Sequence, residues 1–402
     1  MRPNSRSPYG LATRYVGIVA IVVLVVISGS FAALSSGSSR SSTASFSSGS
    51  SSSESTTTST TSITSVSSPS PTPLSVPANP PTHNSASVVR IGYFANLNHA
   101  PAVIGLSNGD FQKFVGPSTA IQTTLFTSGS PEMTALLAGK IDLAYVGPSP
   151  AVNAYLASNG TSLQVISGVA NGGAVFVVRN ASNIASVKEF GGKTFAAPGV
   201  GNTQDVALRH YLILNGYGIS PNGNVTVQDT SNANIVTLMI DGKIDGAWVP
   251  EPWGQVLVSE AGAHIFLNEE SLWPSGFSTT ELVASTSFLK AHPDVVKELI
   301  EANLYETQWI QNNPQQAAVS LNNILGNLTG GPIGLPIIRA AMTRLSFTDS
   351  PLEASVVQQA YNAFALGDLG SSAPTAATLS AIYGLTLLNS VLTEYGLPLV
   401  TG

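Results

Sequence analysis

One short phrase occurs twice in this chain, and it constrains the possible folds more than any other feature. Residues 139–151 read GKIDLAYVGPSPA, and residues 242–253 read GKIDGAWVPEPW. Seven of the first eight positions are identical or exchange one aromatic side chain for another. In each copy a glycine is placed to end a helix, and an apolar strand follows it. A strand-and-turn unit repeated at this distance predicts two similar lobes rather than one large core.

Both copies lie in stretches where expected strands alternate with expected helices. The strands are expected at residues 88–93, 121–126, 141–146, 193–197, 224–229 and 243–249. This alternation is typical of an α/β fold and predicts largely parallel sheets with helices covering their faces. Beyond residue 285 the apolar residues recur at helical spacing, and helices are expected at 292–310, 336–345, 353–366 and 374–395.

The N-terminal residues differ sharply in composition from the rest of the chain. Residues 15–34 are an uncharged run of twenty residues behind Arg2, Arg6 and Arg14, long enough to cross a bilayer as a helix. We favour a membrane anchor for residues 1–34, with a cleaved signal peptide as the alternative, and both predict export. Residues 35–87 are rich in Ser, Thr and Pro, and with so little apolar surface we expect a disordered stalk.

The composition of the remaining chain argues against several classes of function. There is no cysteine, which excludes disulfides and thiol chemistry. Residues 88–402 carry 12 basic and 21 acidic side chains, a formal charge of −9, so we expect no nucleic-acid partner. The histidines lack metal-ligand spacing, and neither a phosphate-binding loop nor a nucleophile elbow is present. We therefore expect no metal, no cofactor and no catalysis.

Asp142 and Asp245 are the one acidic pair that invites a catalytic interpretation. They occupy matching positions in the two copies of the repeated phrase, so the two-lobe prediction places them in different lobes. We expect each carboxylate to orient its own turn rather than to form part of a catalytic dyad.

Short turns rich in hydrogen-bond donors follow several of the expected strands. They read TSGSP at 127–131, GPSP at 147–150, NGG at 171–173 and PGVGNT at 198–203. In open α/β sheets, ligands bind beyond the carboxyl ends of strands and beside helix N-termini. Backbone N–H groups and the helix dipole there can hold an oxyanion without a cationic side chain. A local anion site is therefore compatible with an acidic protein.

The chain resembles the substrate-binding proteins of ABC importers for aliphatic sulfonates, taurine and nitrate. The resemblance spans most of the folded part and rests on residues 92–111, 136–155, 201–209 and 244–253. It implies a bilobed, periplasmic-binding-protein-like (type II) fold with two mixed sheets flanked by helices and a two-segment hinge. Residues 88–174 and 279–402 would form lobe 1, and residues 175–278 would form lobe 2.

The resemblance also implies a ligand site in the cleft between the lobes. The implied residues come from the first loop, the donor-rich turns, the crossover and the second repeated phrase: Phe94, Asn98, His99, Ser128, Gly129, Ser130, Gly147, Ser149, Asn171, Asn202, Thr203, Gln204, Trp248, Glu251 and Trp253. Of these, Trp248 has an alternative role in packing. Glu251 would repel a bare anion, so either this carboxylate is tied up structurally or the ligand carries an amino or other donor group.

The expected function is that of the extracytoplasmic solute-binding component of an ABC importer, acting as a monomer tethered to the outer face of the membrane. An aliphatic sulfonate or taurine-like anion or zwitterion is the leading ligand, and an ABC permease the expected partner. Alternatives are nitrate, bicarbonate or a thiamine-precursor pyrimidine. An enzyme on the same fold would need a nucleophile or a cofactor lysine in the cleft. Lys140 and Lys243 lie at the starts of their strands, whereas the expected cleft lies at the strand ends, so neither lysine is expected in it.

Overall fold

The structure is a computed structural model that describes residues 74–220 and 222–401. The predicted anchor at 1–34 and most of the predicted stalk lie outside the described residues. In the part that is described, no helix is both long enough and apolar enough to cross a membrane.

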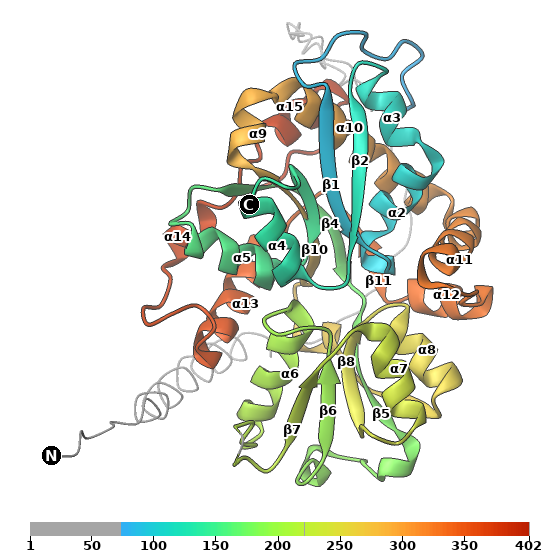
Figure 1. The fold of residues 1–402 in the computed structure, drawn as a ribbon, viewed down its shortest axis with the longest axis vertical. Coiled ribbons are helices and arrows are strands. Elements are labelled where there is room, and N and C mark those ends of the chain that lie inside the picture. Colours follow the sequence, from blue (N-terminus) through green and yellow to red (C-terminus); the bar gives the residue numbers. More distant parts are fainter. Residues whose placement is uncertain (1–73, 221, 402) are drawn as a thin grey trace, which may run out of the picture. The chain divides into compact units, whose positions relative to one another are not determined.

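The first sheet has six strands in the order β11-β4-β10-β3-β1-β2 (Figure 1). β1 is parallel to β2 and to β3, whereas β10 is antiparallel to both β3 and β4, and β11 is antiparallel to β4. The strands are β1 (Val88–Phe94), β2 (Ala120–Phe126), β3 (Leu143–Val146), β4 (Leu163–Gly172), β10 (Ser278–Ser285) and β11 (Leu345–Phe347).

The second sheet has five strands in the order β7-β6-β8-β5-β9. β6 is parallel to β7 and β8, and β5 is antiparallel to β8 and β9. The strands are β5 (Ala174–Arg179), β6 (Thr194–Ala197), β7 (Thr226–Asp229), β8 (Gly246–Pro250) and β9 (Ala263–Asn268). β3 and β8, which carry the repeated phrase, each pair with one parallel and one antiparallel neighbour, so the two sheets are built alike.

The α/β class and the two mixed sheets are confirmed, and β5, β10 and β11 are the strands that run against the direction of the others in their sheets. The reason is the path of the chain between the sheets. β4 continues directly into β5 through Gly172 and Gly173 with no helix between them, and β10 returns to the first sheet. A strand that returns without a covering helical crossover runs antiparallel to its neighbours.

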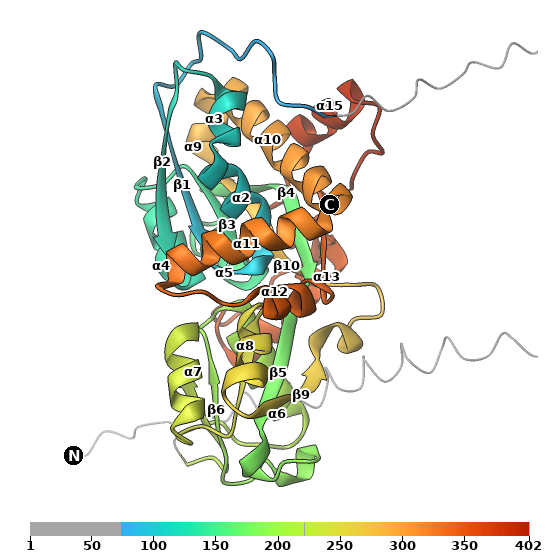
Figure 2. The same cartoon turned by 90° about the vertical axis from the view of Figure 1, so that its right-hand side faces the viewer.

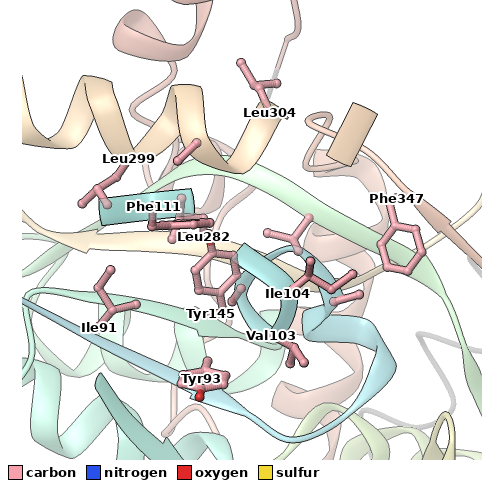
Figure 3. Packing of buried hydrophobic residues seen from close by; sticks show 14 of the residues in the cluster. Ile91, Tyr93, Val103, Ile104, Phe111, Tyr145, Leu282, Leu299, Leu304 and Phe347 are labelled. Carbon is pink, nitrogen blue, oxygen red and sulfur yellow. The ribbon is translucent and has the colours of Figure 1, made fainter. Parts of the chain in front are cut away.

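Helices cover both faces of each sheet (Figures 1 and 2). On the first sheet, one face packs against α2, α3, α9, α10, α11, α12 and α15, and the other against α4, α5, α13 and α14. Their bounds are α2 (Ala100–Asn108), α3 (Asp110–Val115), α4 (Gly129–Leu137), α5 (Pro148–Ala157), α9 (Thr286–Ala291), α10 (Pro293–Asn312), α11 (Pro314–Thr329), α12 (Leu335–Met342), α13 (Glu353–Leu366), α14 (Ala376–Ser380) and α15 (Thr386–Glu394). Figure 3 shows part of the core under α2, α3 and α10.

The second sheet is covered in the same way by fewer helices. α6 (Thr203–Leu214) packs on one face, and α7 (Asn232–Ile240) and α8 (Trp253–Glu260) pack on the other. Four 3₁₀ turns complete the described part: η2 (Leu97–His99), η3 (Asn180–Ser182), η4 (Val187–Glu189) and η5 (Glu269–Leu272). Here each sheet with its covering helices is called a lobe. α13 packs against α6, and α12 packs against α8, so helices of the first lobe touch helices of the second.

Asp142 and Asp245 make matching contacts in the two lobes, to the neighbouring strand rather than to their own turns. Asp142 Oδ2 accepts the backbone N–H of Arg90 at 2.8 Å, and its other oxygen lies 2.7 Å from Arg90 Nη2. Asp245 Oδ2 accepts the backbone N–H of Thr194 at 2.9 Å and lies beside Arg179. Each aspartate thus fastens the start of its strand to the neighbouring parallel strand.

The folded part begins earlier than the composition suggested. Leu74 is buried in the core of the first lobe. The Asn84 side chain donates hydrogen bonds to Val115 O at 2.7 Å and to Glu298 Oε2 at 2.9 Å. Single polar side chains can fix a segment in this way without any apolar pattern that a sequence would display. Residues 74–87, at the end of the predicted stalk, therefore lie on the first lobe.

Candidate functional site

A cavity of about 20 Å³ lies between the two lobes. The first lobe contributes Phe94 at the end of β1, Asn98 and His99 in the turn η2 that follows, and Gly147 after β3. The second lobe contributes Asn202, Thr203 and Gln204 after β6. These seven predicted site residues are brought together by the structure. Among the described residues, the lining contains no Asp, Glu, Lys or Arg.

The lobes are in direct contact around this cavity. The backbone N–H of Gly129 donates to Asn202 Oδ1 at 2.8 Å, and Ser130 Oγ donates to Val200 O at 3.0 Å. On the other side of the cavity, Leu97 N donates to Glu251 O at 2.9 Å. The structure is therefore in a closed arrangement, in which the second lobe completes the site.

Three helices of eight or more residues begin at the cavity. The lining residues Gly147, Asn202 and Asn232 lie at the N-terminal ends of α5, α6 and α7. The Asn202 side chain does not cap its own helix, because its oxygen is bonded to Gly129 across the cleft. The first N–H groups of a helix lack intrahelical partners and carry partial positive charge. A cavity with several such ends and no charged side chain favours an anionic group.

Arg209, in the second turn of α6, is paired with two aspartates. Its Nε lies 2.6 Å from Asp205 Oδ1, and its Nη2 lies 3.1 Å from Asp229 Oδ2. Burial raises the pKa of Asp205 to about 6, although Arg209 acts in the opposite direction. Arg209 does not line the cavity, so an anion there would be held by backbone and neutral side-chain donors.

His99 is fixed in one neutral form at the edge of the site. Its ring stacks on Phe94 with centroids 4.5 Å apart, and Phe94 N donates to His99 Nδ1 at 3.2 Å. Burial lowers the pKa of His99 to about 3, so the ring carries no charge near neutral pH. Because Nδ1 accepts a hydrogen bond, the single ring proton resides on Nε2, which is a donor.

Comparison with known proteins identifies the family. The model of the NMT1-like family matches residues 83–324. This chain belongs to the NMT1-like family. A putative aliphatic sulfonates-binding protein of Bacillus subtilis (strain 168) is 27% identical over 242 residues, which cover 59% of this chain and 69% of that protein.

Solved structures share the fold of this family member. The alkanesulfonate-binding protein SsuA from Xanthomonas axonopodis pv. citri, bound to MOPS, has a TM-score of 0.61 and 21% identity, covering 75% of this chain and 99% of its own. The periplasmic nitrate-binding protein NrtA from Synechocystis PCC 6803 has a TM-score of 0.65 and 16% identity, covering 78% and 90%. The fold is therefore periplasmic-binding-protein-like.

Several predicted site residues lie beside the cavity rather than in its lining. Gly129 and Ser130 make the bonds between the lobes described above, and Ser128 precedes them at the N-cap of α4. Ser149 is buried in the first turn of α5. Asn171 pairs within the first sheet, opposite Ser346 and Ser278. These residues shape the closed cleft.

Trp248 does not line the cavity as predicted, because its side chain lies in the core of the second lobe. It is fully buried, stacks on Phe176 with ring centroids 5.3 Å apart, and donates from Nε1 to Glu269 Oε2 at 2.6 Å. Strand alternation directs it to the face under α6, with its core neighbours. Tyr145, its counterpart in the first copy, is likewise buried in the core.

Glu251 and Trp253 are also outside the lining. Glu251 is fully buried, its Oε1 lies 2.9 Å from Arg344 Nη1, and its Oε2 accepts Gln255 N at 3.0 Å. The carboxylate is therefore tied up structurally, which was one of the two alternatives. Trp253 begins α8 and packs against the core on the other face of the second sheet.

The sequence did not single out seven further lining residues: Asn96, Thr127, Pro198, Asn232, Pro250, Thr279 and Thr280. Thr127 and Pro198 begin two of the donor-rich turns, so the turn pattern could have included them. Thr279 and Thr280 lie inside β10, 132 and more residues after Gly147, where only the folded sheet brings them to the cavity.

The Trp248–Glu269 bond leads to a prediction about stability. Burial raises the pKa of Glu269 from 4.5 to about 7, against the effect of the hydrogen bond from Trp248. The native state therefore keeps a proton that the unfolded chain releases, and the free energy of unfolding falls as pH rises from about 4.5 to 7, by about 3 kcal/mol in total.

Glu269→Gln keeps the hydrogen-bond acceptor and removes this titration. We expect urea unfolding at pH 5 and pH 8 to show a smaller decrease in stability for the variant than for the wild type. Because the comparison subtracts the contribution of the other buried carboxyl groups, equal decreases in the two proteins would contradict the prediction.

Proposed function

We propose that this protein is the extracytoplasmic solute-binding component of an ABC importer and that it captures a small organic anion of the aliphatic sulfonate or taurine type. The observation that carries this proposal is the uncharged cavity between two lobes, at which α5, α6 and α7 begin. The sulfonate-binding proteins among its relatives support the choice of solute class.

Binding would work by closure of the two lobes over the solute. Helix N-termini and hydroxyl groups replace the water around the anionic group, and the ligand shifts an equilibrium between open and closed forms. A micromolar dissociation constant corresponds to about −8 kcal/mol, which a few charge-assisted hydrogen bonds and some apolar burial can supply. No bond in the solute needs to be made or broken.

The expected partners follow from this role. A permease of the same importer would receive the solute, and the N-terminal segment would hold the protein, as a monomer, at the outer face of the membrane. Tethering raises the concentration of the receptor near its permease. A pyrimidine is less well supported as a ligand, because the two rings in the lining, Phe94 and His99, stack on each other rather than facing across the cavity.

A thermal-unfolding screen of the full-length protein tests the solute class. The panel contains alkanesulfonates, taurine, nitrate, bicarbonate and a thiamine-precursor pyrimidine. A ligand that binds only the native state stabilises it by about 2.7 kcal/mol at a concentration of 100 times its dissociation constant, so sulfonates should raise the Tm. A rise with nitrate or the pyrimidine alone would overturn the proposed solute class.

A further inference from the structure

Resting on the proposed function, we infer that the solute carries a hydrogen-bond donor in addition to its anionic group and that Asn98 Oδ1 recognises this donor. The chemical class is an amino- or hydroxy-substituted alkanesulfonate rather than an unsubstituted one. The inference comes from the polar atoms of the lining that have no partner, and from the fixed orientation of one of them.

The Asn98 amide is held in one orientation. Its Nδ2 donates to Gly172 O at 3.0 Å and to Thr279 Oγ1 at 2.9 Å. The Thr279 hydroxyl donates its own proton to a backbone carbonyl, with Gly172 O at 2.7 Å, so it accepts from Asn98. An amide turned by 180° would place its oxygen against Gly172 O. The free end of the side chain is therefore the oxygen.

This oxygen is a buried acceptor that belongs to a residue of the cavity lining. Asn98 is 2% exposed and belongs to the lining, and within residues 74–220 and 222–401 its Oδ1 has no hydrogen-bond partner. Buried polar atoms in native proteins are almost always paired, so an orphaned one in a cavity wall indicates what the cavity receives. A plain sulfonate or nitrate presents only acceptors and would leave Asn98 Oδ1 unpaired. An amine, ammonium or hydroxyl group pairs with it.

Among the described residues, the lining has further buried polar atoms without a partner, including the acceptor Asn232 Oδ1 at the start of α7 in the second lobe. The hydroxyl of Thr203, at the start of α6, is buried and lacks a partner among the described residues, as does that of Thr280 in the first lobe. These hydroxyls can donate to an anionic oxygen beside the helix N-termini. The closed cavity of about 20 Å³ has room for about one water molecule, so the lobes would lie further apart around a solute that spans from an anion-binding end at α6 to Asn98.

The surroundings of Asn98 favour recognition of the donor group of the solute by a neutral acceptor. His99 is uncharged, so it does not repel an ammonium group at the adjacent position. Glu251, the nearest carboxylate that the sequence suggested for this task, is paired with Arg344 and does not line the cavity. A hydroxyl group and an ammonium group can therefore both be accepted.

Isothermal titration of the full-length protein with three matched solutes tests the inference. The solutes are ethanesulfonate, 2-hydroxyethanesulfonate and 2-aminoethanesulfonate (taurine), which differ only in the donor. We expect ethanesulfonate to bind at least about tenfold more weakly than the better of the other two, because sites built to pair with a polar group reject analogues that lack it. Equal binding of all three would overturn the inference.

Variants locate the discrimination at Asn98. Asn98→Leu should abolish the preference for the donor-bearing solutes, because leucine offers no acceptor. Asn215→Leu is the matched control, because the exposed Asn215 side chain donates to Tyr211 O at the end of α6, away from the cavity. Asn98→Leu with an undiminished preference would overturn the inference. The wild-type comparison holds even if that variant does not fold.

The same titration separates this inference from the proposed solute class. If no sulfonate binds, the measurement is repeated with β-alanine against propionate and with 2-aminoethylphosphonate against ethylphosphonate. A preference for the amino member there would support the donor inference and overturn the sulfonate class. Equal binding within the pairs would overturn the donor inference. If no member of any pair binds, both the donor inference and the proposed solute class are overturned.

Discussion

Replacing Gly147 with alanine is expected to weaken solute binding by about 1,000-fold or more, which corresponds to about 4 kcal/mol, without unfolding the protein. Gly147 has φ −70° and ψ 154°, a conformation that alanine adopts freely. The added Cβ would overlap the Thr203 hydroxyl, and the Thr203 Cβ would lie 3.3 Å away. Rotating Thr203 about χ1 can move its hydroxyl aside, but its Cβ stays 3.3 Å from the added methyl group, which is closer than ordinary packing allows. The lobes would have to remain apart.

The expected loss is in binding because the overlap exists only between the lobes. Held apart, the lobes also lose the bond from Gly129 N to Asn202 Oδ1. Gly191→Ala is the matched control, since a Cβ there meets nothing within 4 Å. Titration calorimetry measures affinity, and thermal unfolding without ligand checks the fold. A Gly147→Ala protein that binds within tenfold of the wild type would show that closure does not bring Gly147 against Thr203.

Replacing Arg344 with methionine is expected to lower the free energy of unfolding by about 3–5 kcal/mol at neutral pH. The reason is that Glu251, which is fully buried, would lose the guanidinium 2.9 Å from its Oε1. Burial already raises the pKa of Glu251, and Arg344 and Gln255 N act against that shift. Without Arg344 this pKa rises further, so the native state of the variant holds a proton that the unfolded chain releases.

The sign of the pH dependence follows from that proton. Below the unfolded pKa of the carboxyl, both states are protonated and the variant loses least. As pH rises, the unfolded state gains by ionising and the deficit grows. Chemical denaturation at pH 5 and pH 8 measures the difference. Adding Glu251→Gln to Arg344→Met should recover part of the loss, and a loss under about 1 kcal/mol that does not vary with pH would contradict the prediction.

Local sequence signals were sufficient for most of the secondary structure and for the repeated plan of the lobes. Gly139 and Gly242, each with φ near +65°, stand between a helix and a strand, as the repeated phrase predicts. The direction of the strands could not be predicted from local sequence signals. Six of the eleven described strands were expected, whereas β4, β5, β9, β10 and β11 were not, and the connections of β4 to β5 and of β9 to β10 across the lobes are what make the sheets mixed. The helix α11 (Pro314–Thr329) was missed between expected helices, although Pro314 marks its start.

Some features of the candidate site could also be predicted from local sequence signals, and others could not. The turns that begin α5 and α6 could be predicted because glycine and small polar residues at a strand end are a local signal. The choice between the alternative roles of Glu251 and of Trp248 could not be made locally, because Arg344 is 93 residues from Glu251 in sequence and Trp248 packs against Phe176 of β5 and Tyr211 of α6. The orientation of Asn98 likewise depends on Gly172 and Thr279, which the fold supplies from far along the chain.

The two copies of the repeated phrase agree at one end of their strands and diverge at the other. The shared aspartates, Asp142 and Asp245, hold the scaffold together at the end remote from the cavity. The differing ends, Gly-Pro-Ser-Pro and Pro-Glu-Pro-Trp, enter the cleft with Gly147 and Pro250. Each of these strands thus has one end that stabilises the sheet and one end that lines the cavity. Solute preference can therefore be engineered at the cavity ends of these strands, while the aspartate ends are left unchanged to keep the fold stable.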